Sequence, residues 1–225
     1  MTEPVGHVTG KAGSWRTASN LAPAPSLPPC GRRLRIGLLG GSFNPPHEAH
    51  RLISLIAIRR LKLDAVWWLV TPGNPLKDTT ILPDIAIRME WARHIKHHPR
   101  IHITDIENRI GTRFSVDTLK WLKRRTPSTR FVWLMGSDNL VSFHRWKDWR
   151  TISDLMPMAV IDRPGSTLKA THSRAASALR AYRHPESLQK GLLGHKAPAW
   201  IMLHDKRSAL SSTSLRAQHK LPPAR

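Results

Sequence analysis

GGSFNPPHEAH, residues 40–50, directly follows the apolar run of residues 34–39 and decides the fold. The apolar run predicts a strand, the paired glycines a turn, and the residues after them a helix. Glycine lets a backbone approach an anion closely, and a helix N-terminus offers free N–H groups with a partial positive charge. We expect Asn44 to cap this helix, with Pro45 or Pro46 in its first turn. The stretch therefore predicts a phosphate site.

Two histidines strengthen this prediction. His47 and His50 are three residues apart, so they lie on one face of the expected helix. Two imidazole donors beside a helix N-terminus suit a chain of phosphates. The plainer interpretation, a glycine turn followed by two surface histidines, requires the turn, cap, proline and histidine pair to coincide by chance. The sequence favours a nucleotide site built on these residues.

Length and composition bound the class of protein. The 225 residues suit one α/β domain, and 40% hydrophobic residues are enough for a core. No apolar run reaches the ~20 residues of a membrane span, and the first residues lack the basic-then-apolar pattern of a signal peptide. We therefore expect a soluble, cytoplasmic protein. The single cysteine, Cys30, excludes an intramolecular disulfide and a cysteine-rich metal site.

The charge balance indicates anionic partners. The chain has 36 lysines and arginines against 15 acidic residues, a net charge of +21. Such an excess attracts nucleotides, nucleic acids or acidic surfaces without choosing among them. On charge alone, a basic nucleic-acid-binding module competes with an enzyme that binds nucleotides. The thirteen histidines do not fall at zinc-finger spacing.

The chain divides into two parts. Residues 1–33 are rich in proline and alanine, show no period, and predict a disordered basic extension, so that the domain comprises residues 34–225. Within the domain we expect strands at residues 35–39, 65–71, 101–106, 130–135, 158–162 and 200–203, and helices at residues 47–62, 84–97, 115–125, 138–149, 168–182 and 212–220. Residues 184–199 are predicted to form a surface loop.

Alternation of strands and helices predicts an α/β fold with a doubly wound parallel sheet. In such folds, ligands gather outside the carboxyl ends of the strands. The glycine turn after the first expected strand lies at that edge. The phosphate site and the predicted fold therefore agree.

Two motifs carry a family resemblance. Residues 40–50 are similar to the GGSFNPxHxGH signature of the nucleotidylyltransferase superfamily, and within it to bacterial nicotinate-nucleotide adenylyltransferases; Ala49 stands where that signature has glycine. LSSTSLR, residues 210–216, resembles the ISSTxIR motif of the same superfamily. The resemblance implies a Rossmann-like nucleotidylyltransferase fold.

The resemblance also implies an ATP site. His47 and His50 would contact the α-phosphoryl group, and Asp138, in the GSDNL segment, a ribose hydroxyl. Ser212, Thr213 and Arg216 would hold the departing pyrophosphate. The full set implied for ATP is Gly40, Gly41, Ser42, Phe43, His47, His50, Gly136, Asp138, Ser212, Thr213 and Arg216; the catalytic set is His47, His50, Lys77 and Arg216.

The acceptor side rests on four further segments. Residues 71–78 look like the family's PxxxPHK loop, and residues 111–119 like its SYTxDTL segment, which recognises the nicotinate end. Residues 143–149 resemble its fxxW segment, and residues 162–165 match its RPG turn. A tryptophan would stack on the pyridine ring, and Trp149 is expected in the core instead. The residues implied for the acceptor are Lys77, Ser115, Thr118, Trp146, Lys147 and Arg163. From the residues alone, two plainer interpretations stay open: Lys77 as an exposed loop lysine and Ser115 as an ordinary helix cap.

The implied reaction joins ATP and nicotinate mononucleotide into nicotinate adenine dinucleotide and pyrophosphate, a step of NAD biosynthesis. Mg²⁺ would arrive with ATP, and no metal site made by the protein is expected. Neither a membrane nor a specific nucleic acid is expected as a partner, and the oligomeric state stays open, a homo-oligomer included. The alternatives are a sister adenylyltransferase acting on phosphopantetheine or nicotinamide mononucleotide, and the nucleic-acid-binding module.

Overall fold

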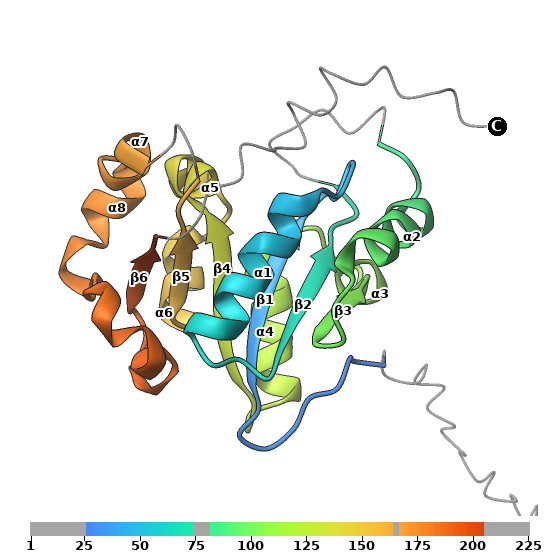
Figure 1. Ribbon diagram of the computed structural model, residues 1–225, viewed down its shortest axis with the longest axis horizontal. Helices are drawn as coiled ribbons and strands as arrows, with labels where there is room; N and C mark the ends of the chain where they lie inside the picture. The colour runs from blue at the N-terminus through green and yellow to red at the C-terminus, as the bar shows by residue number, and fades with distance from the viewer. Residues whose placement is uncertain (1–25, 74–81, 164–166, 205–225) are drawn as a thin grey trace, which may run out of the picture.

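A six-stranded sheet forms the centre of the computed structural model, which describes residues 26–73, 82–163 and 167–204 (Figure 1). All strand pairs are parallel, and their order is β3-β2-β1-β4-β5-β6. The strands are β1 (Arg35–Gly41), β2 (Ala65–Val70), β3 (Ile101–Thr104), β4 (Arg130–Gly136), β5 (Met158–Ile161) and β6 (Trp200–Leu203). The predicted doubly wound sheet is confirmed.

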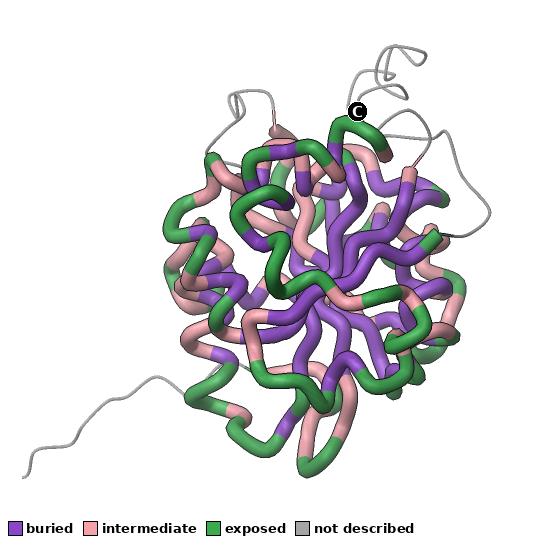
Figure 2. The backbone as a smooth tube through the Cα atoms, turned by 90° about the vertical axis from the view of Figure 1, so that its left-hand side faces the viewer, coloured by how far each residue is buried: buried purple, intermediate pink, exposed green. Residues whose placement is uncertain are grey.

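The strands are mostly apolar because both faces of the sheet are covered; the polar exceptions lie at the first positions of β1 and β4 and in the edge strand β3. Successive side chains of a strand point to opposite faces, so the neighbours Trp67 and Trp68 of β2 pack into separate clusters on the two faces. Both indoles are fully buried. Figure 2 shows the strands as the buried interior of the molecule, with the exposed segments around them.

Helices form a layer on each face. One layer holds α1 (Glu48–Arg60), α2 (Ile85–Lys96) and the 3₁₀ helix η3 (Glu186–Gly194). The other holds α3 (Ile106–Arg109), α4 (Ser115–Arg125), α5 (Ser137–Ser142), η1 (Phe143–Arg145), α6 (Trp149–Leu155), α7 (Thr167–Thr171) and α8 (Arg174–Ala178), with η2 (Arg180–Tyr182) following. No helix in the described ranges combines the length and the apolar character that a membrane span requires.

Two expected long helices are broken. The expectation for residues 138–149 was wrong because the chain is extended at Trp146 and left-handed at Asp148, with φ +47°. The expectation for residues 168–182 was wrong because Ser173 caps a new helix: its hydroxyl accepts the N–H of Ala176 at 3.2 Å. The expected helix at residues 212–220 lies outside the described residues.

The expected surface loop at residues 184–199 was also wrong. Most of it is η3, which lies against the face that α1 covers. Leu192 is fully buried there, and Leu193 is nearly so. The proline, glycine and histidine content predicted a loop, but two adjacent leucines supply enough apolar surface to anchor a short helix.

Residues 26–33, counted above with the extension, are described and lie against the domain. The N–H of Arg33 donates to the carbonyl of Ser128 at 3.0 Å, and the Thr129 hydroxyl donates to the carbonyl of Gly31 at 3.1 Å. Leu27 packs against the core. Residues 1–25 lie outside the described residues.

The burial of η3 predicts an asymmetry between two of its leucines. Leu192→Ala should lower the free energy of unfolding by about 3 kcal/mol, because it removes buried methyl groups and leaves a cavity. Leu188→Ala is the matched control, since Leu188 is 40% exposed, and should change stability by less than about 0.5 kcal/mol. Urea denaturation measures both values. A loss of stability in Leu192→Ala as small as that in Leu188→Ala would show that η3 does not bury Leu192.

Candidate functional site

The candidate site lies where β1 and β4 end. These neighbouring strands lead to helices on opposite faces of the sheet, α1 on one and α5 on the other. In parallel sheets such a switch point leaves a crevice outside the carboxyl ends of the strands. Residues 40–43, called the phosphate turn below, comprise the last two residues of β1 and the two that follow, at this end of the sheet.

The phosphate turn is anchored by a buried aromatic ring. Phe43 is fully buried and has φ +47°, a left-handed conformation that is rare for a bulky residue. This conformation brings its ring parallel to Trp68, with the ring centroids 5.1 Å apart, and places it 4.6 Å from His50. The turn therefore rests on the core and positions an imidazole.

The start of α1 differs from the expectation. His47, not Asn44, is the N-cap, and α1 begins at Glu48. The N–H of His47 donates to Nδ1 of His50 at 3.2 Å, and the two rings lie 3.9 Å apart between centroids. The predicted pairing of the two histidines on one face is therefore present, with His47 serving as the cap.

A second set of contacts supports His50 from behind. The indole N–H of Trp68 donates to Oγ of Ser54 at 2.8 Å, and the Ser54 hydroxyl donates to the carbonyl of His50 at 2.8 Å. Both Trp68 and Ser54 are fully buried. The backbone and the ring of His50 are thus both held by the core.

The electrostatics of the site make His50 a neutral donor. Burial lowers its pKa well below the usual 6.5, and the charges of His47 and Arg163 lower it further. Because Nδ1 accepts a backbone N–H, the proton of the neutral ring lies on Nε2. His50 therefore offers one N–H donor without a full positive charge.

Residues from β4, α5 and the end of β5 converge on the same crevice. Nη1 of Arg163 lies 3.0 Å from Oδ2 of Asp138, and the N–H of Arg163 donates to the Ser137 hydroxyl at 2.9 Å. A Cβ on Gly136 would lie 2.8 Å from Cδ of Arg163 and would also collide with Asp138. Glycine at position 136 therefore gives these two side chains room to meet.

The two segments predicted to recognise the pyridine end also come together. Nζ of Lys147 lies 4.3 Å from the centroid of the Phe114 ring and 3.7 Å from a carboxylate oxygen of Asp117. Phe114, and not Ser115, is the N-cap of α4. The beginning of α4 thus has Lys147 beside it together with the Asp117 carboxylate of its own first turn.

Trp146 lies next to this cluster in a half-buried position. Its indole meets Phe143 and Trp133 edge to face, with centroids 5.5 Å and 6.2 Å apart. Trp149 is buried against Phe143, as predicted. One ring of the pair therefore keeps surface for a ligand while the other belongs to the core.

Glu107 was missed by the sequence analysis. It is 2% exposed, and burial raises its pKa to about 7, against hydrogen bonds to Thr71 and Thr118 that lower it. The Thr118 hydroxyl, which has no exposed surface, lies 3.3 Å from Oε1 of Glu107. In this arrangement Thr118 supports the first turns of α4 from inside. Four residues of α3 are too few for periodicity to reveal a buried carboxyl group.

Several expectations lie outside the described residues, namely those for Lys77, Ser212, Thr213 and Arg216. Within the described ranges, no group of three or more histidine, cysteine or acidic side chains is arranged to hold a metal ion. The site as described consists of the phosphate turn, the histidine pair, the Asp138–Arg163 pair and the Lys147–Phe114 cluster.

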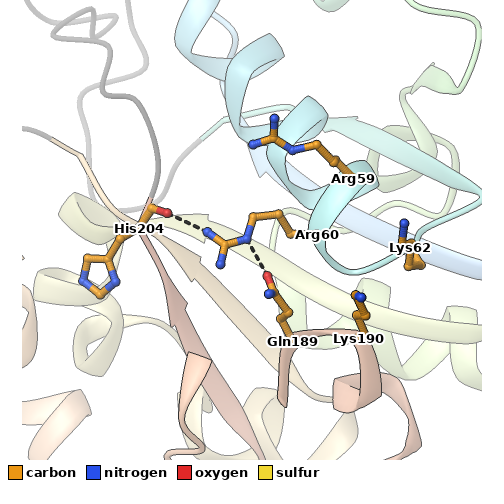
Figure 3. A pocket seen from close by; sticks show the side chains of 6 residues that line it. All are labelled: Arg59, Arg60, Lys62, Gln189, Lys190 and His204. Carbon is orange, nitrogen blue, oxygen red and sulfur yellow. Dashed lines mark hydrogen bonds between the residues drawn. The ribbon is translucent and has the colours of Figure 1, made fainter. Parts of the chain in front are cut away.

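A pocket of about 370 Å³ lies elsewhere, and Figure 3 shows its lining residues Arg59, Arg60, Lys62, Gln189, Lys190 and His204. The Arg60 guanidinium donates to the carbonyl of His204 at 2.6 Å and to the Gln189 side chain, and it also pairs with Glu186. None of the predicted site residues lines this pocket. Its arginine joins the end of α1 to η3 and to the end of β6.

Comparisons with known proteins show the family and the fold of this chain. Residues 38–218 match the family described as cytidylyltransferase-like. The chain is 54% identical over 183 residues to a probable nicotinate-nucleotide adenylyltransferase of Bradyrhizobium sp., covering 81% of this chain and 95% of the relative. The chain belongs to the nicotinate-nucleotide adenylyltransferase family. The relative in Brucella suis, which carries the same name, is 47% identical over 193 residues, 85% of this chain and all of its own.

A solved structure supports the fold of this adenylyltransferase family member. Plasmodium falciparum nicotinic acid mononucleotide adenylyltransferase complexed with NaAD superposes with a TM-score of 0.61 at 18% identity, covering 82% of this chain and 83% of the other. At that identity the likeness concerns the fold. The Rossmann-like nucleotidylyltransferase fold expected from the motifs is therefore confirmed.

The environment of His50 predicts a pKa that responds to phosphate. In the free protein, titration followed by NMR should give a pKa below 6.5, because burial and neighbouring charges disfavour the imidazolium. A non-hydrolysable ATP analogue should raise this pKa, because phosphates favour the charged ring. The signal is assigned by its loss in His50→Gln. A pKa that the analogue leaves unchanged would place His50 away from the phosphates.

The environment of Glu107 predicts how stability depends on pH. Its pKa is about 7 in the folded chain and 4.5 ordinarily, so the unfolded chain releases its proton first as pH rises. As pH rises from 4.5 to about 7, this carboxyl group should therefore lower the free energy of unfolding by on the order of 3 kcal/mol, and the loss should persist at higher pH. Glu107→Gln should remove that cost and be more stable than the parent at pH 8.

The control is Glu90→Gln, because Glu90 is exposed on α2. Subtracting parent from variant at each pH cancels the contributions of the histidines. A difference for Glu107→Gln that stays constant from pH 4 to pH 8 would show that this group titrates normally.

Proposed function

We propose that this chain transfers the adenylyl group of ATP to nicotinate mononucleotide, releasing pyrophosphate and forming nicotinate adenine dinucleotide for NAD biosynthesis. The observation that carries the proposal is the convergence, at the β1–β4 switch point, of a phosphate turn with a histidine pair and an Asp–Arg pair. The names of the relatives at 47–54% identity support the choice of acceptor.

The chemistry requires charge neutralisation and positioning. A phosphate oxygen of the mononucleotide attacks the α-phosphorus of ATP; the new O–P bond forms as the bond from that phosphorus to the β-phosphate oxygen breaks, and pyrophosphate leaves with the electron pair. The attacking oxygen is already ionised at neutral pH, so no general base is needed. Donors and cations that fit the transition state supply the rate enhancement.

The described residues fit these needs. N–H groups of the phosphate turn and of the first turn of α1 face an anion with the positive end of the helix dipole. Nε2–H of His50 would donate to an oxygen of the α-phosphoryl group, as would His47. Arg163 would bring a full positive charge to the same phosphates, while Asp138 would accept a ribose hydroxyl proton in a hydrogen bond.

The remaining roles stay as the motifs predict them. Ser212, Thr213 and Arg216 would hold the leaving pyrophosphate, and Lys77 would contact the incoming phosphate. All four residues lie outside the described ranges. Arg216 would stabilise the charge that develops on the departing group, which is the point where the transition state differs most from bound ATP.

The acceptor base would lie between Trp146 and the beginning of α4. A flat pyridine ring suits the exposed part of the indole, which Phe143 and Trp133 hold in place. Its carboxylate would then meet N–H groups at Ser115 with Lys147 close by. A carboxylate gains from both, whereas an uncharged amide does not gain from the cation, so the nicotinate form would bind more tightly.

Mg²⁺ would enter with ATP. Around the phosphate turn, the described site offers two imidazoles, Arg163 and a single carboxylate, Asp138, whereas Mg²⁺ prefers several oxygen ligands. These residues do not form a cage for the ion, and phosphate oxygens and water would hold it instead. We also retain the prediction of a cytoplasmic location.

The test measures pyrophosphate release from ATP with three acceptors side by side: nicotinate mononucleotide, nicotinamide mononucleotide and phosphopantetheine. We expect the highest kcat/KM with nicotinate mononucleotide. Preference for phosphopantetheine would assign the chain to a sister reaction, and binding of RNA at physiological salt without pyrophosphate release would favour the nucleic-acid-binding module.

The same assay locates the reaction at the described site. His50→Ala should lower kcat about 100-fold or more, because one donor to the transition state is worth about 3 kcal/mol. His94→Ala is the control, since His94 is exposed on α2 and pairs with Glu90. An unchanged kcat in the His50 variant would remove that imidazole from the mechanism.

A further inference from the structure

Arg88 is a buried cation that neither the motifs nor the proposed mechanism uses. It lies on α2 and is only 1% exposed. An arginine is almost never fully buried unless its charge is compensated. Its neighbours on the same helix face, Met89 and Ala92, are ordinary core residues. The position therefore requires an explanation beyond packing.

The guanidinium of Arg88 donates to three backbone carbonyls from separate segments. Nη1 lies 2.7 Å from the carbonyl of Ser42, in the phosphate turn, and 2.8 Å from that of Thr71, just after β2. Nε lies 2.8 Å from the carbonyl of Pro83, just before α2. One rigid fork thus fixes the phosphate turn to two neighbouring segments.

A fourth contact makes the arrangement tighter. The N–H of Thr71 donates to the carbonyl of Gly41 at 3.0 Å. Gly41 and Ser42 are therefore held through consecutive carbonyl groups, one by Thr71 and one by Arg88. Because a peptide group is planar, fixing the carbonyl of Ser42 also fixes the direction of the next N–H in the turn.

The charge of Arg88 is not balanced by an ion pair within the described residues. No carboxylate oxygen there lies within salt-bridge distance of it. The acidic group that acts on it electrostatically is Asp84, whose carboxylate accepts the N–H of Ala86 at 2.7 Å. Burial lowers the pKa of Arg88 from its usual value, and Asp84 opposes this only in part.

We propose that Arg88 is a positioning residue for ATP: its guanidinium orients the phosphate turn, and the bound triphosphate balances its buried charge. The inference rests on the proposed function, because it takes the ligand of the turn to be ATP. It adds a residue behind the turn, which acts on the nucleotide through the peptide groups of Ser42 and Thr71.

A purely structural role has different consequences. If Arg88 only fastened α2 to the sheet, its replacement would lower stability and weaken both substrates alike. A positioning role weakens ATP more than the mononucleotide, because Ser42 lies in the phosphate turn whereas the segments proposed for the pyridine ring, at α4 and η1, lie on the other face of the sheet. Arg88 reaches the acceptor side only through the carbonyl of Thr71, the first residue of the loop at residues 71–78, so the mononucleotide should lose less affinity. Separate binding measurements for the two substrates therefore distinguish the roles.

The experiment compares Arg88→Lys and Arg88→Met with a control, Arg93→Met. Lysine keeps the charge but cannot donate to three carbonyls in a fixed plane. Arg93 lies on the same helix, is 51% exposed, and pairs with Glu90 at 2.7 Å, so its loss leaves the turn untouched. Calorimetry gives the dissociation constants of ATP and of nicotinate mononucleotide for each folded protein.

We expect Arg88→Lys to weaken ATP about 10-fold, about 1.4 kcal/mol, and to leave the mononucleotide within about 2-fold of the parent. Arg88→Met should weaken ATP further, and Arg93→Met should match the parent. Native ATP affinity in Arg88→Lys, or equal losses for both substrates, would overturn the proposal. Should the methionine variant not fold, the lysine variant decides alone.

The outcome is separable from that of the proposed function. Pyrophosphate release by the parent protein tests the reaction, whereas the ratio of ATP affinities between parent and Arg88→Lys tests the positioning role. A parent that binds ATP but releases no pyrophosphate with any acceptor would refute the reaction. In that case a selective loss of ATP affinity in the lysine variant would still support the role of Arg88.

Discussion

Parallel pairing of β1 with β4 is the constraint on which the site depends. The register pairs Leu39 with Leu134, and two residues beyond them lie Gly41 and Gly136. The two strands thus end level with each other, and both end in glycine. Since α1 and α5 then leave toward opposite faces, the ends of β1 and β4 lie at a switch point, where folds of this kind bind their ligands.

The polar groups beneath this crevice are as informative as those that line it. Burying a charge is costly, so a fold retains one only where something offsets the cost. Arg88 lies behind the turn where phosphates are proposed, and Glu107 lies below the helix where a carboxylate is proposed. Arg88, a cation, thus lies near the phosphates that are proposed to bind. Glu107 lies near the proposed carboxylate of the acceptor, and its raised pKa reduces the negative charge that would repel this carboxylate.

The sequence predicted the elements whose signals are local. Six apolar runs became six strands because a sheet covered on both faces favours apolar residues at most strand positions. The phosphate turn and the pairing of His47 with His50 were found because short-range spacing determines them. The helix break at Asp148 was missed, because a single left-handed residue leaves the apolar period unchanged on either side.

Local sequence patterns could not predict which charged groups are buried. Whether Glu107 or Arg88 faces water depends on which segments fold over them, and these segments are distant in sequence. One hint was present: Arg88 falls in the apolar stripe of α2, with Ile85 three residues before it and Ala92 four residues after it. A cation in such a stripe is a candidate for a role behind a site.

The stack of Phe43 on Trp68 joins the hydrophobic core to His50 of the candidate site. His50 touches this stack through its ring, and its carbonyl reaches the same indole through Ser54. A substitution at Trp68 in β2 would therefore also change the position of the His50 imidazole. A swap of one large apolar residue for another, which other parts of the core tolerate, is restricted here because it would move the ring of His50.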